Sequence, residues 1–231
     1  MTRSTGLLAL VVGAGPAGAA TVLAALATDP TARVALVDRA TFPRDKFCGD
    51  GLTPSAVATL GELGVDHVLD GFAPVEQLEV TAPAGGRMCT EVREPAYVVT
   101  RREFDARLVN AAVSRGAELI TSRVSDLVPD VDRVVIDGRW SARHVVAADG
   151  ANSTVRRSLG LPRHPDAHVG LALRGYTRVP AGPGRLDIRF VPGRLWPSYG
   201  WLFTGGDGHA NVGVGTFEPP PGPTGGSWRR C

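Results

Sequence analysis

The chain has 231 residues, 43% of them hydrophobic, which is enough to bury a substantial core in one domain or two. Its 25 basic and 23 acidic residues are spread along the sequence and leave a formal net charge of +2. This balance excludes a basic stripe, so we expect no nucleic-acid partner. The three cysteines are odd in number and widely spaced, which argues against a disulfide framework or a metal site and favours a cytoplasmic protein.

The chain opens with the pattern of a dinucleotide-binding strand–helix–strand unit. A hydrophobic run over 7–12 predicts a buried strand, GAGPAG follows at 13–18, and a second predicted strand over 33–37 ends on Asp38. Asp38 is placed to accept hydrogen bonds from an adenosine ribose. A hydrophobic anchor or signal peptide is the alternative, since residues 6–28 carry no charge, but the turn glycines and the acid-ended strand favour nucleotide binding.

The glycines of this turn each have a physical reason to be there. Gly13 permits the tight turn out of the strand, Gly15 lets the backbone approach a pyrophosphate, and Gly18 lets the helix pack closely on the sheet. A helix expected over 16–27 directs its free N–H groups and the positive end of its dipole toward the phosphates.

Beyond this unit, the hydrophobic pattern predicts two more helices and a series of strands. The helices are expected at about 53–63 and 102–115, and the strands at 75–82, 87–93, 118–124, 132–137, 142–148, 168–177, 185–191, 198–204 and 209–217. An acid–glycine pair, Asp149 and Gly150, ends the strand that begins at 142.

Four further segments carry motifs. They are FPRDKFCGDGLT at 42–53, YVVTRREFD at 97–105, ADGANSTVRR at 148–157, and YGWLFT at 199–204 with GHANVGVG at 208–215. With the glycine turn, these motifs resemble the geranylgeranyl reductase family over about residues 7–217. The order of elements resembles the flavoprotein monooxygenase-type FAD fold. The resemblance implies an α/β fold, with a Rossmann-like, three-layer FAD-binding domain and an inserted antiparallel-sheet substrate domain.

The resemblance also implies FAD as the cofactor. The residues it assigns to cofactor binding are Gly13, Gly15, Pro16, Ala17, Gly18, Asp38, Arg39, Arg44, Arg101, Asp149 and Gly150. Arg101 begins a predicted helix, where the dipole disfavours a cation, so a nearby anion would explain it; a solvated arginine is the alternative. Asp105 is expected to cap or pair locally. The Asp149 turn could also be an ordinary one, in which Asn152 or Ser153 caps a helix.

The same resemblance places Cys48 and Gly49 in a loop that faces flavin and substrate. Arg44 and Lys46 would add positive charge there, and an inert buried thiol is the alternative for Cys48. The predicted substrate residues lie on one strand, where alternate side chains share a face, although such a strand can also be plain core. They are Tyr199, Trp201 and Phe203.

The implied activity is that of an FAD-dependent oxidoreductase that reduces C=C bonds of an isoprenoid or prenyl lipid. Electrons would come from NADPH or another donor, and the lipid substrate would bring the protein into peripheral contact with a membrane. One alternative is a flavin-dependent monooxygenase or halogenase-like enzyme on the same fold. The other is a truncated, non-catalytic nucleotide-binding fragment.

Domain boundaries follow from the same reasoning. We expect a discontinuous FAD-binding domain over 1–72 and 97–162, an incomplete substrate sheet over 73–96 and 163–217, and a disordered tail over 218–231. Family members carry a second flavin-contacting glycine–acid motif after the last matched strand. The sequence lacks this motif, so we expect a truncated product that binds FAD weakly.

Overall fold

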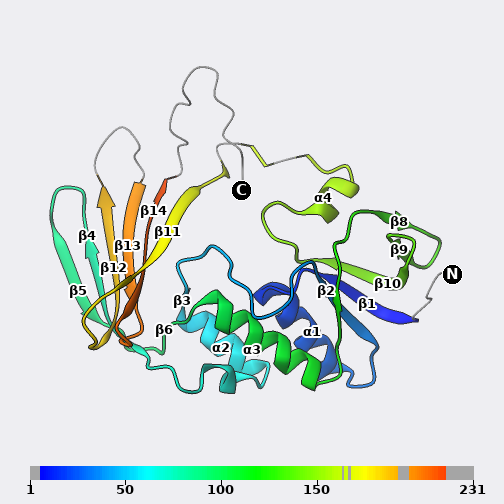
Figure 1. Cartoon of the computed structure of the whole chain (residues 1–231), viewed down its shortest axis with the longest axis horizontal. Coiled ribbons are helices and arrows are strands. Elements are labelled where there is room, and N and C mark those ends of the chain that lie inside the picture. The colour runs from blue at the N-terminus through cyan, green and yellow to red at the C-terminus, as the bar shows by residue number, and fades with distance from the viewer. Residues whose placement is uncertain (1–5, 163, 166–167, 192–197, 217–231) are drawn as a thin grey trace. The chain divides into compact units, whose positions relative to one another are not determined.

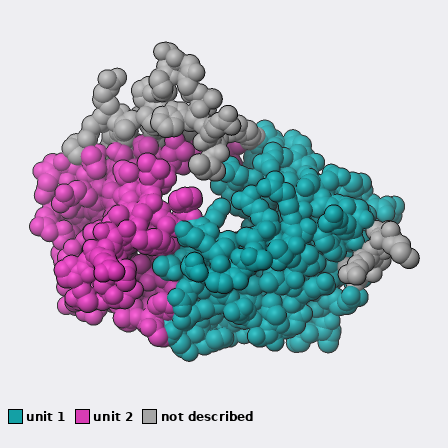
Figure 2. Space-filling view, viewed as in Figure 1, with its two compact units in different colours: residues 1–46, 58–70, 100–163 teal, residues 47–57, 71–99, 164–231 magenta. Residues whose placement is uncertain are grey.

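In the computed structural model, which describes residues 6–162, 164–165, 168–191 and 198–216, the chain divides into two units (Figures 1 and 2). Unit 1 comprises Met1–Lys46, Ala58–Asp70 and Thr100–Arg163, and unit 2 comprises Phe47–Val57, Gly71–Val99 and His164–Cys231. The predicted domain boundaries stay a prediction, and the structure differs from them by grouping Phe47–Val57 with unit 2. The tail expected over 218–231 lies outside the described residues.

Unit 1 is built on a six-stranded mixed sheet with the order β7-β2-β1-β10-β9-β8. Its strands are β1 Leu7–Val12, β2 Val34–Asp38, β7 Glu118–Thr121, β8 Leu127–Pro129, β9 Val134–Ile136 and β10 Trp140–Ala147. Strands β7, β2, β1 and β10 run parallel, and the β9 and β8 pairs are antiparallel. The chain thus returns to the nucleotide sheet after leaving it, because β10 pairs with β1.

Both faces of the central strands are buried, which explains their continuous hydrophobic sequences. Leu10 and Val37 belong to a cluster with Leu127 and Ile136, so the β8–β9 ribbon covers that face. Residues of the other alternation, such as Leu36, are equally buried, and α1 packs against β1 and β2. Helices, central sheet and ribbon make the three layers expected from the sequence.

Three helices lie where the hydrophobic pattern predicts them: α1 Pro16–Thr28, α2 Pro54–Glu62 and α3 Arg101–Ser114. The helix α4 Thr154–Ser158 follows the Asp149 turn, and the short 3-10 helix η1 Asp66–Leu69 was not expected. In unit 1, α1 packs beside α3 (Figure 1). The Thr53 hydroxyl, just before α2, accepts a hydrogen bond from the Ala56 N–H at 3.4 Å.

Unit 2 contains a second six-stranded sheet with the order β11-β14-β13-β12-β4-β5. Its strands are β4 Val75–Thr81, β5 Arg87–Glu91, β11 Leu171–Arg178, β12 Gly184–Val191, β13 Ser198–Thr204 and β14 His209–Thr216. All neighbours are antiparallel except β12 and β4. Two-residue strands, β3 Gly51–Leu52 and β6 Tyr97–Val98, pair separately and were not expected, because two residues carry no periodic signal.

Two glycines hold α1 close to the end of β1. A Cβ atom on Gly18 would lie 1.8 Å from the Gly13 carbonyl oxygen, and Gly13 itself has a φ of 101°, in the left-handed region. A Cβ on Gly13 would lie 2.3 Å from the Ala148 oxygen at the end of β10. The packing role predicted for Gly18 and the turn role predicted for Gly13 are therefore both seen.

We predict that Gly18→Ala lowers the free energy of unfolding by at least about 3 kcal/mol, since the added methyl group collides with backbone rather than with a movable side chain. Gly61→Ala is the matched control, because nothing lies within 4 Å of a Cβ at that position of α2. The control should gain up to about 1 kcal/mol from helix propensity. Urea unfolding followed by circular dichroism measures both changes, and equal midpoints for the two variants would contradict the close-packing argument.

Candidate functional site

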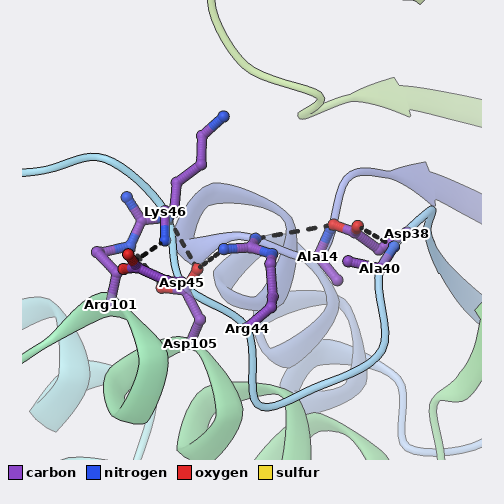
Figure 3. A network of polar contacts seen from close by, with 8 residues as sticks. All are labelled: Ala14, Asp38, Ala40, Arg44, Asp45, Lys46, Arg101 and Asp105. Atoms are coloured by element: carbon purple, nitrogen blue, oxygen red, sulfur yellow. Dashed lines mark hydrogen bonds and ion pairs between the residues drawn. The ribbon is translucent and has the colours of Figure 1, made fainter. Parts of the chain in front are cut away.

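In unit 1, the side chain of Asp38 at the end of β2 is hydrogen-bonded to the glycine turn. The Asp38 Oδ2 atom accepts a hydrogen bond from the Ala14 N–H at 2.9 Å, and Oδ1 accepts one from the Ala40 N–H at 2.9 Å (Figure 3). A carboxylate oxygen can accept more than one hydrogen bond, so Asp38 keeps acceptor capacity for a ribose hydroxyl. Its contact with Ala14 is a structural role that the sequence pattern did not reveal.

The N-terminus of α1 is suited to an anion. Gly15 is its N-cap, Pro16 occupies the first turn, and no acidic residue lies in that turn. The positive dipole end and the N–H groups of the first turn, including that of Ala17, are therefore not offset by a carboxylate on the same helix.

Two guanidinium groups lie beside this N-terminus and share one buried carboxylate (Figure 3). Arg44 Nη1 donates to Asp105 Oδ2 at 2.8 Å, while Arg101 donates from Nε to Oδ1 at 2.6 Å and from Nη2 to Oδ2 at 2.8 Å. The Asp105 side chain is 0% exposed and each arginine is 17% exposed. A buried carboxylate is tolerated only with such charged partners, so the two arginines are held in place.

The same guanidinium groups face Gly15. A Cβ on Gly15 would lie 3.5 Å from Arg101 Nη2 and 3.8 Å from Arg44 Nη2. Arg44 also stacks on the Phe42 ring, 4.9 Å from its centroid, which restricts its motion further. A bare glycine between a helix N-terminus and two oriented guanidinium groups fits the diphosphate of a dinucleotide such as FAD.

The expected anion beside Arg101 is Asp105, one turn along α3. The local pairing predicted for Asp105 is confirmed, and Arg44, 61 residues away in the chain, shares the carboxylate, which no local pattern predicts. Contact of Arg101 with the cofactor stays a prediction. Arg39 is exposed after β2, and the Lys46 N–H donates to its neighbour Asp45 at 2.8 Å; neither observation adds to their predicted roles.

The Asp149 carboxylate is directed at the start of α4. It accepts hydrogen bonds from the Ser153 hydroxyl at 2.6 Å and from the Thr154 and Val155 N–H groups at 2.5 and 3.2 Å. Ser153 in turn caps α4 by accepting from the Arg156 N–H at 3.0 Å. The alternative interpretation of this turn, with Ser153 as the cap, is thus present in the structure. The cofactor contacts of Asp149 and Gly150 stay predictions.

In unit 2, the segment Cys48–Gly51, which we call the Cys48 loop, lies against the aromatic strand β13. A Cβ on Gly49 would lie 3.4 Å from Phe203 Cε2 and 3.6 Å from Trp201 Nε1. The structure therefore brings together the predicted loop residues and two of the predicted substrate residues. It places them side by side within one unit, although about 150 residues of sequence separate them.

The aromatic residues of β13 form a continuous row on one face of the sheet. Ring centroids are 5.8 Å apart for Tyr199 and Trp201, and 6.4 Å apart for Trp201 and Phe203. Phe190 on β12 extends the row, with its ring 6.3 Å from that of Tyr199. Gly213 on β14 gives the Trp201 ring its space, since a Cβ there would lie 2.2 Å from the ring. The predicted shared face is confirmed.

Polar residues that belong to none of the predicted sites join the Cys48 loop to this face. Asn211 Nδ2 donates to the Cys48 carbonyl and to Asp50 Oδ2, each at 2.8 Å, and the Tyr176 hydroxyl donates to Asp50 Oδ2 at 2.7 Å. Trp201 Nε1 donates to Asn211 Oδ1 at 2.8 Å. Nothing in the local sequence marks a single asparagine in a strand for such a role. Its partners are distant in the sequence and are brought to it only by the fold.

An open hollow of about 770 Å³ lies along the unit 2 sheet, but we do not choose it as the candidate substrate site. Its lining includes Leu202 and Val214, which alternate with the aromatic positions and so point to the other face. Glu79 binds Arg87 there and raises the pKa of that guanidinium by hydrogen bonding and charge attraction. Because these two charges are paired with each other, we place the candidate substrate surface on the aromatic face.

We predict that Arg44→Gln raises the dissociation constant for FAD by about tenfold to a hundredfold, since a charged hydrogen bond contributes about 1.5–3 kcal/mol. The fold should survive, because Arg101 still binds both oxygens of Asp105. Quenching of FAD fluorescence during titration measures the constant. Arg143→Gln, at an exposed position of β10, is the control for lost charge. If both variants bind FAD equally well, the diphosphate does not lie at Gly15.

Comparison with known proteins places this geometry in a family. A model of the FAD binding domain matches residues 7–173. The menaquinone reductase of Mycolicibacterium smegmatis is 38% identical, over 90% of this chain and 54% of its own length. Digeranylgeranylglycerophospholipid reductase 1 of Methanopyrus kandleri is 36% identical, over 92% and 59%. The chain thus spans between half and three-fifths of the length of these curated relatives.

Solved structures agree on the fold. A geranylgeranyl bacteriochlorophyll reductase-like protein from Thermoplasma acidophilum matches with a TM-score of 0.74 and 24% identity, over 90% of this chain and 56% of that one. A flavin-dependent brominase matches with a TM-score of 0.77 and 19% identity, over 91% and 56%. The expected α/β fold, with its separate and largely antiparallel sheet, is confirmed. Because the family model covers most of the sequence, the chain belongs to the FAD-binding domain family.

Proposed function

We propose that this protein is an FAD-dependent reductase that saturates a C=C bond in the isoprenoid chain of a prenyl lipid. The observation that carries the proposal is the aromatic face of unit 2, on which the Cys48 loop is held. Rings such as Trp201 and Phe203 offer an apolar wall to a long, flexible hydrocarbon, and the glycines of the loop pack directly against them.

The residues of the chain have separate tasks in this proposal. Arg44 and Arg101 neutralise the FAD diphosphate and orient it at Gly15, and Asp38 binds the ribose. The aromatic face binds the isoprenoid chain and excludes water from it. Reduction of one C=C bond requires a hydride equivalent and a proton. Bound FAD would supply the hydride chemistry, with two electrons from NADPH or another donor, which is oxidised in return.

Among prenyl lipids, a menaquinone is the first substrate to test. A menaquinone reductase is 38% identical to the chain, and a reductase of a geranylgeranylated phospholipid is 36% identical. Both names describe enzymes that act on molecules with isoprenoid chains, although the two head groups differ. The shared feature is the isoprenoid chain, which is what an aromatic wall without a dense set of charges would bind.

The expected product identifies the reaction. With FAD, NADPH and a menaquinone in detergent, without oxygen, the lipid should gain the mass of two hydrogen atoms in its isoprenoid chain, and NADPH should be consumed in equal amount. Liquid chromatography with mass spectrometry measures the product. Insertion of an oxygen atom or a halogen under aerobic conditions would instead support the monooxygenase or halogenase alternative. No turnover by an FAD-loaded chain would support the non-catalytic alternative.

Phe203→Ala should raise the KM for the prenyl lipid by about tenfold, because it removes apolar surface equivalent to about 1.5–3 kcal/mol. Its FAD affinity should match that of the unaltered chain, since FAD is expected to bind unit 1. Steady-state kinetics and an FAD titration separate the two effects. An unchanged KM would mean that the lipid does not bind the aromatic face.

Cytoplasmic location and peripheral membrane contact stay predictions. Among the described residues, no helix combines the length and apolar character needed to cross a membrane.

A further inference from the structure

The side chain of Asn211 links two parts of unit 2 that the proposed reaction uses. Its amide nitrogen donates to the Cys48 carbonyl and to Asp50 Oδ2, and its amide oxygen accepts from Trp201 Nε1, all at 2.8 Å. Asn211 is 2% exposed, so water does not compete effectively for these bonds. One buried amide therefore contacts both the Cys48 loop and the aromatic row.

The chemistry of the partners determines which way this amide points. The Trp201 indole N–H can only donate, and the Cys48 carbonyl can only accept. The oxygen of Asn211 must therefore face Trp201, and its NH₂ group must face the loop, where both of its protons are used. Aspartate or leucine at this position cannot make the same set of bonds, so the site specifies an amide rather than merely a side chain of suitable size.

The loop has a backbone conformation that needs such support. Asp50 has a φ of 62°, in the left-handed region, which residues with a side chain adopt only at a cost. It is also 2% exposed. Asn211 and the Tyr176 hydroxyl both donate to Asp50 Oδ2, and the Val99 N–H donates to its carbonyl oxygen at 2.9 Å. These bonds hold the strained residue in place.

We propose that Asn211, supported by Tyr176, is a positioning residue that fixes the Cys48 loop and the Trp201 ring relative to each other. Its importance for catalysis rests on the proposed function, because the loop and the ring then border the prenyl chain. The positioning itself requires neither FAD nor substrate. Reactivity of the Cys48 thiol reports on the loop directly, and Cys89, an exposed residue on β5, provides an internal reference.

The decisive variant is Asn211→Asp, which keeps the acceptor for Trp201 but turns a carboxylate oxygen toward the carboxylate of Asp50. Adjacent carboxylates raise the pKa of one of the pair, so the pair binds a proton in acid and repels at higher pH. Tyr176, Cys48 and Arg174 are the other ionisable groups of this region, with Arg174 stacked on Tyr176 at 4.4 Å. The loop should stay bound at about pH 5 and open at about pH 8.

Opening of the Cys48 loop is measured as the rate at which a dipyridyl disulfide labels the Cys48 thiol. This reagent labels thiols in acid as well as at neutral pH, and mass spectrometry quantifies each labelled peptide. We expect Asn211→Asp to label at Cys48 about tenfold faster than the unaltered chain at about pH 8, and no more than about threefold faster at about pH 5, where only one of the two hydrogen bonds to the loop is lost. Cys89 should label at the same rate in both proteins. Asn110→Asp, the same change at an exposed position of α3, should behave as the unaltered chain.

Tyr176→Phe removes a single hydrogen bond and gives a second test if Asn211→Asp does not fold. It should accelerate Cys48 labelling by about threefold at either pH, because no new charge is introduced. Unchanged Cys48 labelling in both variants, or equal acceleration at Cys48 and Cys89, would overturn the proposal. If labelling changes as expected but no prenyl lipid is reduced, the proposed function fails and the positioning role stands.

Discussion

The buried carboxylate of Asp105 organises the side chains beside the N-terminus of α1 in unit 1. Removing a carboxylate from water costs several kcal/mol unless charged donors replace the water, and here Arg44 and Arg101 do so with three hydrogen bonds. The arginines stabilise the buried carboxylate, and the carboxylate in turn holds the two cations close together. Their positive charge is then concentrated beside Gly15, at the positive end of α1. Asp38 Oδ2 also lies 3.8 Å from Arg44 Nη2, so two carboxylates and two guanidinium groups meet near Gly15.

The close approach of α1 to the sheet puts that N-terminus in place. Gly18 lies against the Gly13 carbonyl, and Asp38 binds the Ala14 N–H, so turn, helix and second strand form one rigid assembly. These contacts explain why small residues and an acid occur at these positions in the sequence. They also explain why a motif of six residues, 13–18, carries so much information about the fold.

Sequence reasoning succeeded where a residue's role depends on its neighbours in the chain. The strands and helices follow from alternation and helical spacing, and the shared face of Tyr199, Trp201 and Phe203 follows from the geometry of a strand. It failed where the partner is remote or the element is short. The bond from Arg44 to Asp105 and the links from Asn211 to Cys48 depend on the tertiary fold, which no local spacing encodes.

The two units hold their loops by different kinds of interaction. In unit 1 the interaction is between charges, because the buried Asp105 carboxylate binds Arg44 and Arg101. In unit 2, neutral hydrogen bonds from an asparagine and a tyrosine hold a strained aspartate next to an aromatic row. This difference suits the proposed ligands, since a diphosphate needs charge and an isoprenoid chain needs an apolar surface with its polar groups already paired.

The most direct measurement is the visible absorption spectrum of the chain after incubation with FAD or with riboflavin and removal of free ligand by gel filtration. Riboflavin has the same ring system but lacks the diphosphate and the adenosine. If Gly15, Arg44 and Arg101 bind the diphosphate, the chain retains the flavin spectrum with FAD and loses it with riboflavin. Equal retention of the two flavins would show that the diphosphate does not bind at Gly15.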